Sequence, residues 1–125
     1  MSFRFRKHQR IKSPDEFKQV YANKQWGNTR LLTFNVLAID GPSQLGVTVS
    51  KKVSKLAVRR NHLKRQIKEF YRLHQAELNN AKVVITVKPA ARNTDNAEVQ
   101  RELADLWGKL LKWQRWQAHQ SRDVK

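Results

Sequence analysis

Residues 30–39 are rich in strand-forming side chains, and polar Thr33 and Asn35 alternate there with apolar neighbours; residues 45–50 alternate in the same way. Alternation with a period of two places every second side chain on the same face, which is typical of half-buried β-strands. The segment between them, Asp40-Gly41-Pro42-Ser43, is rich in turn-forming residues. The pattern therefore predicts a β-hairpin. A third strand is predicted at residues 82–88, where β-branched residues prevail and Pro89 ends the run.

Three helices are predicted from capping residues and from apolar positions three and four residues apart. Ser13-Pro14-Asp15-Glu16 combines an N-cap, a proline suited to the first turn and a capping-box glutamate, so a helix is expected up to residue 22. Residues 23–28 then read as a turn. A long basic helix is expected over residues 54–78. A last helix begins at Asp95, with Glu98 placed for a second capping box. The apolar stripe of this last helix is expected in the core and consists of Val99, Leu103, Leu106, Leu110 and Trp113.

The order of these elements is α-β-β-α-β-α, which indicates an α+β sandwich with helices packed on a small mixed sheet. A chain of 125 residues with 39% hydrophobic residues is expected to form one domain over residues 1–125. Residues 1–12 hold five Lys or Arg and no acid. We interpret them as a basic N-terminal arm that lies on a polyanion, and a frayed terminus is the equally weighted alternative.

The basic helix has two chemically distinct faces. At about 100° per residue, one face carries the apolar side chains Leu56, Leu63, Ile67 and Phe70. The other face, here called the cationic ridge, consists of Asn61, Lys64, Arg65, Lys68 and Arg72. Residues 51–72 hold nine Lys or Arg against one acid, Glu69, and like charges three or four residues apart repel one another. Because solvated faces usually mix signs, an anionic partner is favoured over a solvated face.

The overall charge indicates which kind of partner this is. The chain carries +16 at pH 7 with a pI near 10.9, and residues 1–72 hold 17 basic and four acidic side chains. Such a charge points to nucleic acid first and to an anionic membrane second. No apolar run reaches the ~18 residues of a membrane span, and the N-terminus lacks the apolar centre of a signal peptide. Together with the absence of cysteine, this predicts a cytoplasmic protein without disulfides.

Side chains for catalysis by the protein alone are not grouped in the sequence. The four histidines lack metal-site spacing, no glycine-rich loop precedes a Lys-Ser/Thr pair, and the ten acids are scattered. No catalytic or metal-binding residue is therefore predicted. Phe17, Tyr21 and Phe34 are candidates for a platform on which unpaired bases stack, at ~1–3 kcal/mol per base. Residue type alone favours the core for these three rings and for Trp116.

One segment of the chain resembles a known family. Residues 46–72 contain a strand that ends in Val-Ser-Lys-Lys and then the pattern Arg-Asn-x-x-Lys-Arg, formed by Arg60, Asn61, Lys64 and Arg65. This combination is similar to the signature of the bacterial ribonuclease P protein component. The runs Ser-Pro-Asp-Glu-Phe-Lys-Gln-Val-Tyr and Lys-Val-Val-Ile-Thr-Val-Lys-Pro resemble the family's first helix and last strand. The resemblance implies a fold like that of ribosomal protein S5 domain 2.

The resemblance also implies a function. Members of the family bind a catalytic RNA that removes the 5′ leader of precursor tRNA, with magnesium bound mainly through the RNA and no organic cofactor. The protein is then expected to assist an endoribonuclease without catalysing the reaction itself. Its expected partners are the catalytic RNA and the precursor tRNA leader, with no membrane and no obligate protein partner. A general RNA-binding or ribosome-associated basic protein is the alternative, and a stand-alone nuclease is a third class.

The family's contacts imply site residues by position. The residues expected to bind the catalytic RNA are Lys51, Lys52, Arg59, Arg60, Asn61, Lys64, Arg65, Lys68 and Arg72. A cleft between a sheet face and the first helix is implied to hold the leader, which leaves Phe17, Tyr21 and Phe34 evenly divided between core and cleft. The sequence departs from the commonest pattern at His62 and Lys68, where arginine is frequent, and at Lys82, where aspartate is frequent. A lysine keeps the charge of an arginine but loses its bidentate fork.

Overall fold

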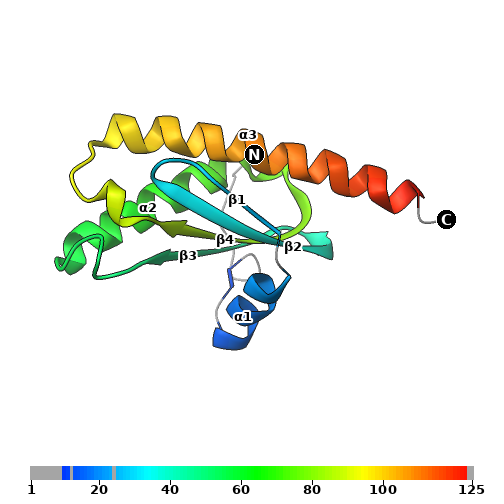
Figure 1. Cartoon of the computed structure of the whole chain (residues 1–125), viewed down its shortest axis with the longest axis horizontal. Coiled ribbons are helices and arrows are strands. Elements are labelled where there is room, and N and C mark those ends of the chain that lie inside the picture. The colour runs from blue at the N-terminus through cyan, green and yellow to red at the C-terminus, as the bar shows by residue number, and fades with distance from the viewer. Residues whose placement is uncertain (1–9, 12, 24, 124–125) are drawn as a thin grey trace.

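The computed structural model describes residues 10–11, 13–23 and 25–123. In chain order the elements are α1 (Pro14–Ala22), β1 (Trp26–Asn28), β2 (Leu32–Pro42), β3 (Gln44–Val49), α2 (Ala57–His74), β4 (Asn79–Val87) and α3 (Asn96–Asp123), with short 3-10 turns at Gln75–Glu77 and Pro89–Ala91 (Figure 1). The predicted α+β class is confirmed. The predicted N-terminal arm lies outside the described residues except for Arg10 and Ile11.

The strands form one mixed sheet in the order β1-β2-β4-β3. β2 runs antiparallel to β4, whereas β3 runs parallel to β4. The predicted hairpin of β2 with β3 is therefore wrong, because β4 lies between these strands. The residues of β4 explain its place. Its side chains are buried on both faces of the sheet, as the neighbours Val83 and Val84 show, and such a strand belongs in the interior of a sheet.

A short strand occupies part of residues 23–28, for which the sequence predicted only a turn. β1 pairs antiparallel with β2, with Trp26 opposite Asn35 and Gly27 opposite Phe34. A Cβ atom on Gly27 would lie 2.7 Å from the Phe34 ring, so the strand fits beside that ring because residue 27 has no side chain. Gly and Asn are poor strand formers. The strand propensity of these residues therefore does not predict β1, which forms because it pairs with β2.

The two faces of the sheet are covered differently. α2 and α3 lie on one face and α1 lies on the other (Figure 1). The main core lies between the sheet and the α2–α3 layer, and its helical side chains include Leu63, Ile67, Val99, Leu103, Leu106 and Leu110. On the other face, Phe17 and Val20 of α1 pack against Ile11, Leu37 and Val84 in a much smaller cluster. The predicted apolar stripe of the last helix is thus confirmed as core.

α2 is shorter than predicted, and its apolar stripe differs by one member. The helix covers Ala57–His74 instead of residues 54–78. Leu56 precedes the first turn and is 71% exposed, so its place in the predicted stripe is wrong. Tyr71 is buried instead, and its hydroxyl lies 2.5 Å from the hydroxyl of the buried Ser43. Burial raises the pKa of Tyr71, and the bond with Ser43 offsets part of that effect. A phenol enters this core because the β2–β3 connection supplies a partner for its hydroxyl.

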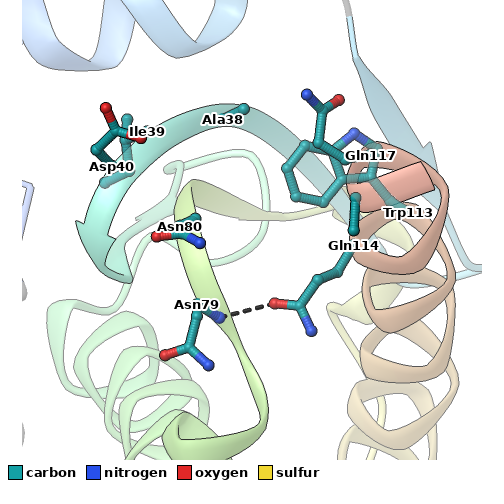
Figure 2. Close-up of a pocket in the computed structure, with 9 residues that line it drawn as sticks. Ala38, Ile39, Asp40, Asn79, Asn80, Trp113, Gln114 and Gln117 are labelled. Atoms are coloured by element: carbon teal, nitrogen blue, oxygen red, sulfur yellow. Dashed lines mark hydrogen bonds between the residues drawn. The ribbon is translucent and has the colours of Figure 1, made fainter. Parts of the chain in front are cut away.

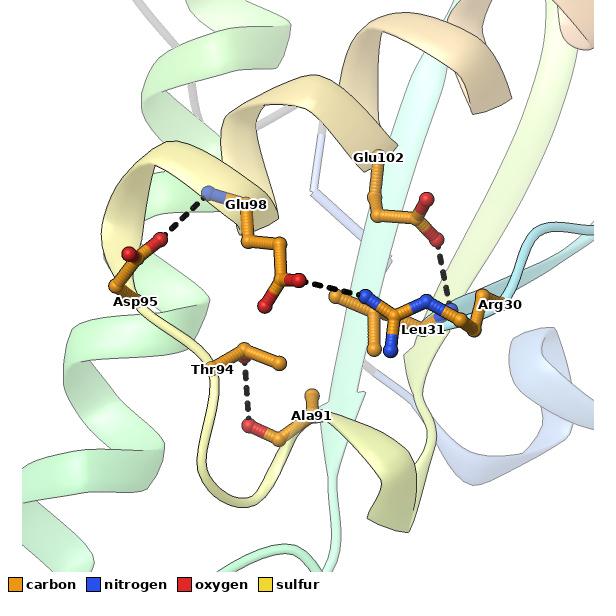
Figure 3. A network of polar contacts seen from close by, with 7 residues as sticks. All are labelled: Arg30, Leu31, Ala91, Thr94, Asp95, Glu98 and Glu102. Atoms are coloured by element: carbon orange, nitrogen blue, oxygen red, sulfur yellow. Dashed lines mark hydrogen bonds and ion pairs between the residues drawn. The ribbon is translucent and has the colours of Figure 1, made fainter.

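Both predicted capping sites are formed. The Glu16 N–H donates to the Ser13 hydroxyl at 3.2 Å at the start of α1. At α3, the Glu98 N–H donates to Asp95 Oδ1 at 2.8 Å (Figure 3). The Glu98 carboxylate does not complete a capping box but pairs with Arg30, 2.8 Å away, at the entrance to β2.

Glu102 connects α3 to the start of β2. Its Oε1 accepts a hydrogen bond from the Leu31 N–H at 2.8 Å (Figure 3). Burial works against ionisation of this carboxyl, but the hydrogen bonds from Thr29 and Leu31, together with nearby cations, hold its pKa below the ordinary value. The carboxylate thus gives a backbone N–H at the end of the sheet the partner that it needs.

Candidate nucleic-acid interface

The predicted RNA-binding residues begin in the turn between β3 and α2. Lys51 and Lys52 are exposed, and Val53, directly after them, is fully buried. The Val53 N–H donates to the Ser50 carbonyl at 3.1 Å, and the Lys52 carbonyl accepts a bond from Arg92 at 2.7 Å. A buried valine and a closed turn therefore keep both lysines on the surface.

Arg59 and Arg60 are anchored at the start of α2. The Arg59 guanidinium donates to the Thr94 carbonyl at 2.8 Å, and the Arg60 guanidinium donates to the Ser54 carbonyl at 2.9 Å. Both residues are half-buried. A guanidinium has five N–H donors, so an anchored arginine can still bind a phosphate. Because its side chain is already ordered, binding then costs less conformational entropy.

The cationic ridge is present on the surface of α2. Asn61, Arg65 and Lys68 are exposed, and Lys64 is half-buried. Burial lowers the pKa of Lys68, and the positive charges of Arg10 and Lys64 lower it further. Arg10 belongs to the N-terminal segment, which forms a bridge to β3. The fold therefore adds a cation from outside the helix to the charge that the helix itself carries.

Arg72 differs from the other members of the ridge because it is paired with an acid. Its guanidinium donates to both carboxylate oxygens of Glu69, at 3.0 and 2.5 Å. This bond lowers the pKa of Glu69 and raises that of Arg72. The net charge of the ridge therefore comes from Lys64, Arg65 and Lys68.

Two of the three predicted leader-binding rings lie on α1. Phe17 is half-buried and covers Gly46, where a Cβ atom would lie 2.8 Å from the ring. It also packs in the small cluster with Val20 and Val84. Tyr21 is 42% exposed. Phe17 thus holds α1 on the sheet, and Tyr21 is the more accessible ring.

Phe34, the third predicted ring, does not join them. It is 3% exposed and belongs to the main core under α2 and α3, whereas α1 packs on the opposite face of the sheet. The prediction of one platform formed by Phe17, Tyr21 and Phe34 is therefore corrected. Alternation along β2 places the next residue, Asn35, on the α1 face instead.

Trp26 is a candidate that the sequence reading missed. It is 62% exposed and lies opposite Asn35 in the β1–β2 register. Paired residues in neighbouring strands point to the same side of a sheet, so Trp26 lies on the α1 side at the β1 edge. The sequence indicates Trp26 only as a large aromatic residue in a polar segment. Its place on the sheet can be assigned only when β1 and its pairing with β2 are known.

A row of threonines crosses the α1 face of the sheet. Thr33, Thr86 and Thr48 are aligned across β2, β4 and β3. The three are half-buried, and Thr48 Oγ1 donates to Thr86 Oγ1 at 2.9 Å. Beside α1, this face is therefore formed by short polar side chains.

Two of the residues that differ from the family's commonest pattern contact other elements of the fold. Lys82 Nζ lies 3.6 Å from Glu16 Oε2, with 13% of the Lys82 side chain exposed, so this lysine ties β4 to α1. His62 Nε2 lies 3.1 Å from Asn96 Oδ1 at the start of α3. Both residues therefore connect elements of the fold.

A hollow of about 590 Å³ lies under the C-terminal half of α3, away from the predicted site residues (Figure 2). Asp40, Asn79, Asn80, Trp113 and Gln114 are among the residues that line it. The Asn79 N–H donates to Gln114 Oε1 at 2.7 Å across one side. This bond attaches α3 to the beginning of β4.

Neither a metal cluster nor a membrane helix is found in the part of the chain that the structure describes. Within residues 10–11, 13–23 and 25–123, no three His, Asp or Glu side chains gather in a group that could hold a metal ion. None of the described helices combines the length and apolar character that a membrane crossing requires.

The sequence is similar to curated proteins along most of its length. The family model for ribonuclease P matches residues 5–111. A ribonuclease P protein component from Idiomarina loihiensis is 38% identical over 118 residues, which cover 90% of each chain. One from Stutzerimonas stutzeri is 36% identical over 113 residues, or 88% of this chain and 86% of the other.

The fold is also similar to solved structures. The RNase P protein from Staphylococcus aureus superposes with a TM-score of 0.74 at 24% identity, over 87% of this chain and 93% of that one. The protein from Thermotoga maritima gives a TM-score of 0.69 at 20% identity, over 78% and 93%. These comparisons match the α+β fold described above.

Proposed function

The chain belongs to the ribonuclease P protein family, and from this membership we propose that its α2 surface binds the enzyme's catalytic RNA while the α1 face of its sheet receives the 5′ leader of precursor tRNA. As a ribonuclease P protein component, it is part of an RNA–protein endoribonuclease of tRNA processing and has the ribonuclease P RNA as its partner. The proposal adds which surface of the protein binds each RNA and which component of the enzyme catalyses the reaction.

The observation that carries the proposal is the arrangement of cations along α2. The signature residues Arg60, Lys64 and Arg65 lie on a helix whose other side is anchored in the core. Two arginines are held in place by backbone carbonyls. Positive side chains in fixed positions suit the phosphates of a folded RNA, since phosphate contacts set the register of a protein on nucleic acid.

We assign the chemistry to the RNA and to magnesium bound mainly through it. The role of the protein is then electrostatic. Its cations neutralise phosphates that magnesium would otherwise have to screen, so the assembled enzyme needs less magnesium. No further protein is required in this proposal, because this chain itself presents both binding surfaces.

The leader is assigned to the α1 face because of the side chains found there. Tyr21 and Trp26 are exposed rings on this side of the sheet, and the threonine row beside them is polar. Stacking on aromatic rings tolerates any base, so leaders of different sequence could bind the same face.

Reconstitution at low magnesium tests the proposal. Cleavage of a precursor tRNA by the purified catalytic RNA is measured with and without the protein. The protein is expected to raise the rate most where magnesium is scarce, and an unchanged rate contradicts the proposal. In a parallel reaction, protein and magnesium without the catalytic RNA are expected to give no site-specific cleavage.

A matched pair of variants separates this function from general RNA binding. Arg65→Ala is expected to weaken binding to the catalytic RNA and to lower its salt slope by about one unit. Arg101→Ala removes another exposed cation, from α3, and serves as the control. If bulk duplex DNA competes as well as the catalytic RNA at moderate salt, the chain is a general nucleic-acid-binding protein instead.

A further inference from the structure

The C-terminal half of α3 carries a second surface of a single charge sign. Between residues 106 and 122 the sequence has four Lys or Arg and no Asp or Glu. Lys112 and Arg115 are exposed, and Trp116 is 49% exposed. At about 100° per residue, these three side chains fall within roughly 100° of one another, on the side of the helix opposite the buried stripe. We call them the α3 patch.

The signature residues of α2 do not account for this patch. The family match ends at residue 111, whereas α3 continues to Asp123. Figure 1 shows the C-terminal part of the helix extending past the end of the sheet. All three residues of the α3 patch follow residue 111, where the family match ends.

Two hydrogen bonds fix α3 along the β1 edge of the sheet. Lys109 Nζ donates to the Asn28 carbonyl at 2.5 Å. The Trp113 indole N–H donates to Gln25 Oε1 at 3.0 Å. The α3 patch therefore begins beside the β1 edge, whereas α2 and its ridge lie over β3 at the opposite edge.

Two exposed tryptophans border this edge. Trp26 directly follows the anchoring Gln25 and lies on the α1 side of the sheet. Trp116 follows the anchored Trp113 by three residues and lies on the α3 side. A strand of RNA that leaves the α1 face at Trp26 would thus meet Trp116 next, with Lys112 and Arg115 beyond it.

We propose that the distal part of the precursor tRNA leader continues over the β1 edge and binds the α3 patch as single-stranded RNA. This inference rests on the proposed leader site on the α1 face. Trp116 stacks on an unpaired base, while Lys112 and Arg115 bind the adjoining phosphates. Single-stranded RNA fits better than a duplex, because the bases of a duplex are already stacked on each other.

Leader length is the variable that tests the inference. Affinity of the assembled enzyme is measured for precursor tRNAs whose leaders grow from short ones that end on the sheet face to longer ones. Wild-type affinity is expected to rise again once the leader passes the β1 edge. Trp116→Ala should remove this second rise, a loss of roughly tenfold. Trp116→Phe should keep most of it, since phenylalanine also stacks.

A charge-matched pair supplies the second readout. Arg115→Ala is expected to lower the salt slope by about one unit for long leaders only. Arg101→Ala removes the same side chain from the same helix, within the family-matched segment, and should leave that slope unchanged. Alanine is a strong helix former, so circular dichroism should show α3 intact in both variants.

Different results overturn the inference and the leader site. If Trp116→Ala affects short and long leaders equally, or neither, while Trp26→Ala still weakens leader binding, the α3 patch is excluded and the leader site stands. If Trp26→Ala has the same effect on precursor and mature tRNA, the leader site fails and the inference fails with it. A change in sedimentation without a change in leader affinity would assign Trp116 to a contact between two copies of the chain and overturn the inference.

Discussion

The face of the sheet under α2 and α3 is apolar across its width, whereas the face under α1 carries threonines, Asn35 and Lys82 beside one small apolar cluster. The first face is closed by two helices that bury their stripes on it. The second is covered in part by a helix of nine residues. The main hydrophobic core and the candidate leader site thus lie on opposite faces of the same sheet.

The difference follows from the cost of removing polar groups from water. A threonine hydroxyl or an amide buried without a partner destabilises a fold by about 1–3 kcal/mol. A large helical cap over this face would impose that cost on every polar group that it left without a partner, so the face suits a polar ligand better than an apolar helix. We expect substitutions on the first face to act on folding and substitutions on the second face to act on RNA binding.

Leu63→Ala should give the largest effect. Leu63 is fully buried in the main core, and such truncations cost about 2–5 kcal/mol. Urea unfolding measures the loss. Leu56→Ala, at the 71% exposed position that the sequence placed in the same stripe, should change stability by no more than about 0.5 kcal/mol. Equal losses at the two positions would contradict the stripe seen in the structure.

Trp26→Ala should affect binding instead of folding. Removing this exposed ring is expected to weaken binding of leader-bearing precursor tRNA by about 1–3 kcal/mol, the usual contribution of one stacked base. Mature tRNA, which has no leader, is the matched substrate and should bind as before. The free energy of unfolding should stay within about 0.5 kcal/mol of the wild type. Identical losses for both tRNAs would contradict the proposed leader site.

Glu102→Gln tests the polar edge of the helix-covered face. Its carboxylate accepts the Leu31 N–H, and losing the charge should cost about 1 kcal/mol. Because folding lowers the pKa of Glu102 from 4.5, its stabilisation is present above about pH 4.5 and is lost as the pH falls through the folded-state value. Thermal unfolding from pH 7 to pH 3 should show a smaller acid-induced loss in the variant than in the wild type.

Lys82→Ala should have the smallest effect. The Lys82–Glu16 pair is partly exposed, and such pairs contribute up to about 1 kcal/mol. A double-mutant cycle with Glu16→Gln, measured by urea unfolding, isolates the pair from the role of Glu16 at the start of α1. Lys82→Asp should destabilise more than Lys82→Ala, since it places two acids together. A zero coupling energy would show that the Lys82–Glu16 pair does not stabilise the fold.

Local sequence signals were sufficient for several elements. The Ser13–Glu16 cap, the bounds of α1 and the buried stripe of α3 agree with prediction because caps and helical periodicity depend on residues a few positions apart. The cations of the ridge could also be assigned from the sequence, since helix geometry alone places them on one side. The Glu69–Arg72 pair has the same local origin, because its members are three residues apart.

Residues far apart in the sequence decided the rest. Alternation showed that Phe34 and Asn35 point in opposite directions, but only the packing of α2 and α3 determined that Phe34 faces the core. The order of the strands depended on β4, which pairs with both β2 and β3. The sequence by itself thus determined the helices, the charge and the signature segment, because these depend on neighbouring residues. The tertiary structure alone decided which side of the sheet remains open and which rings lie there, because strand pairing and helix docking join segments that no local pattern relates.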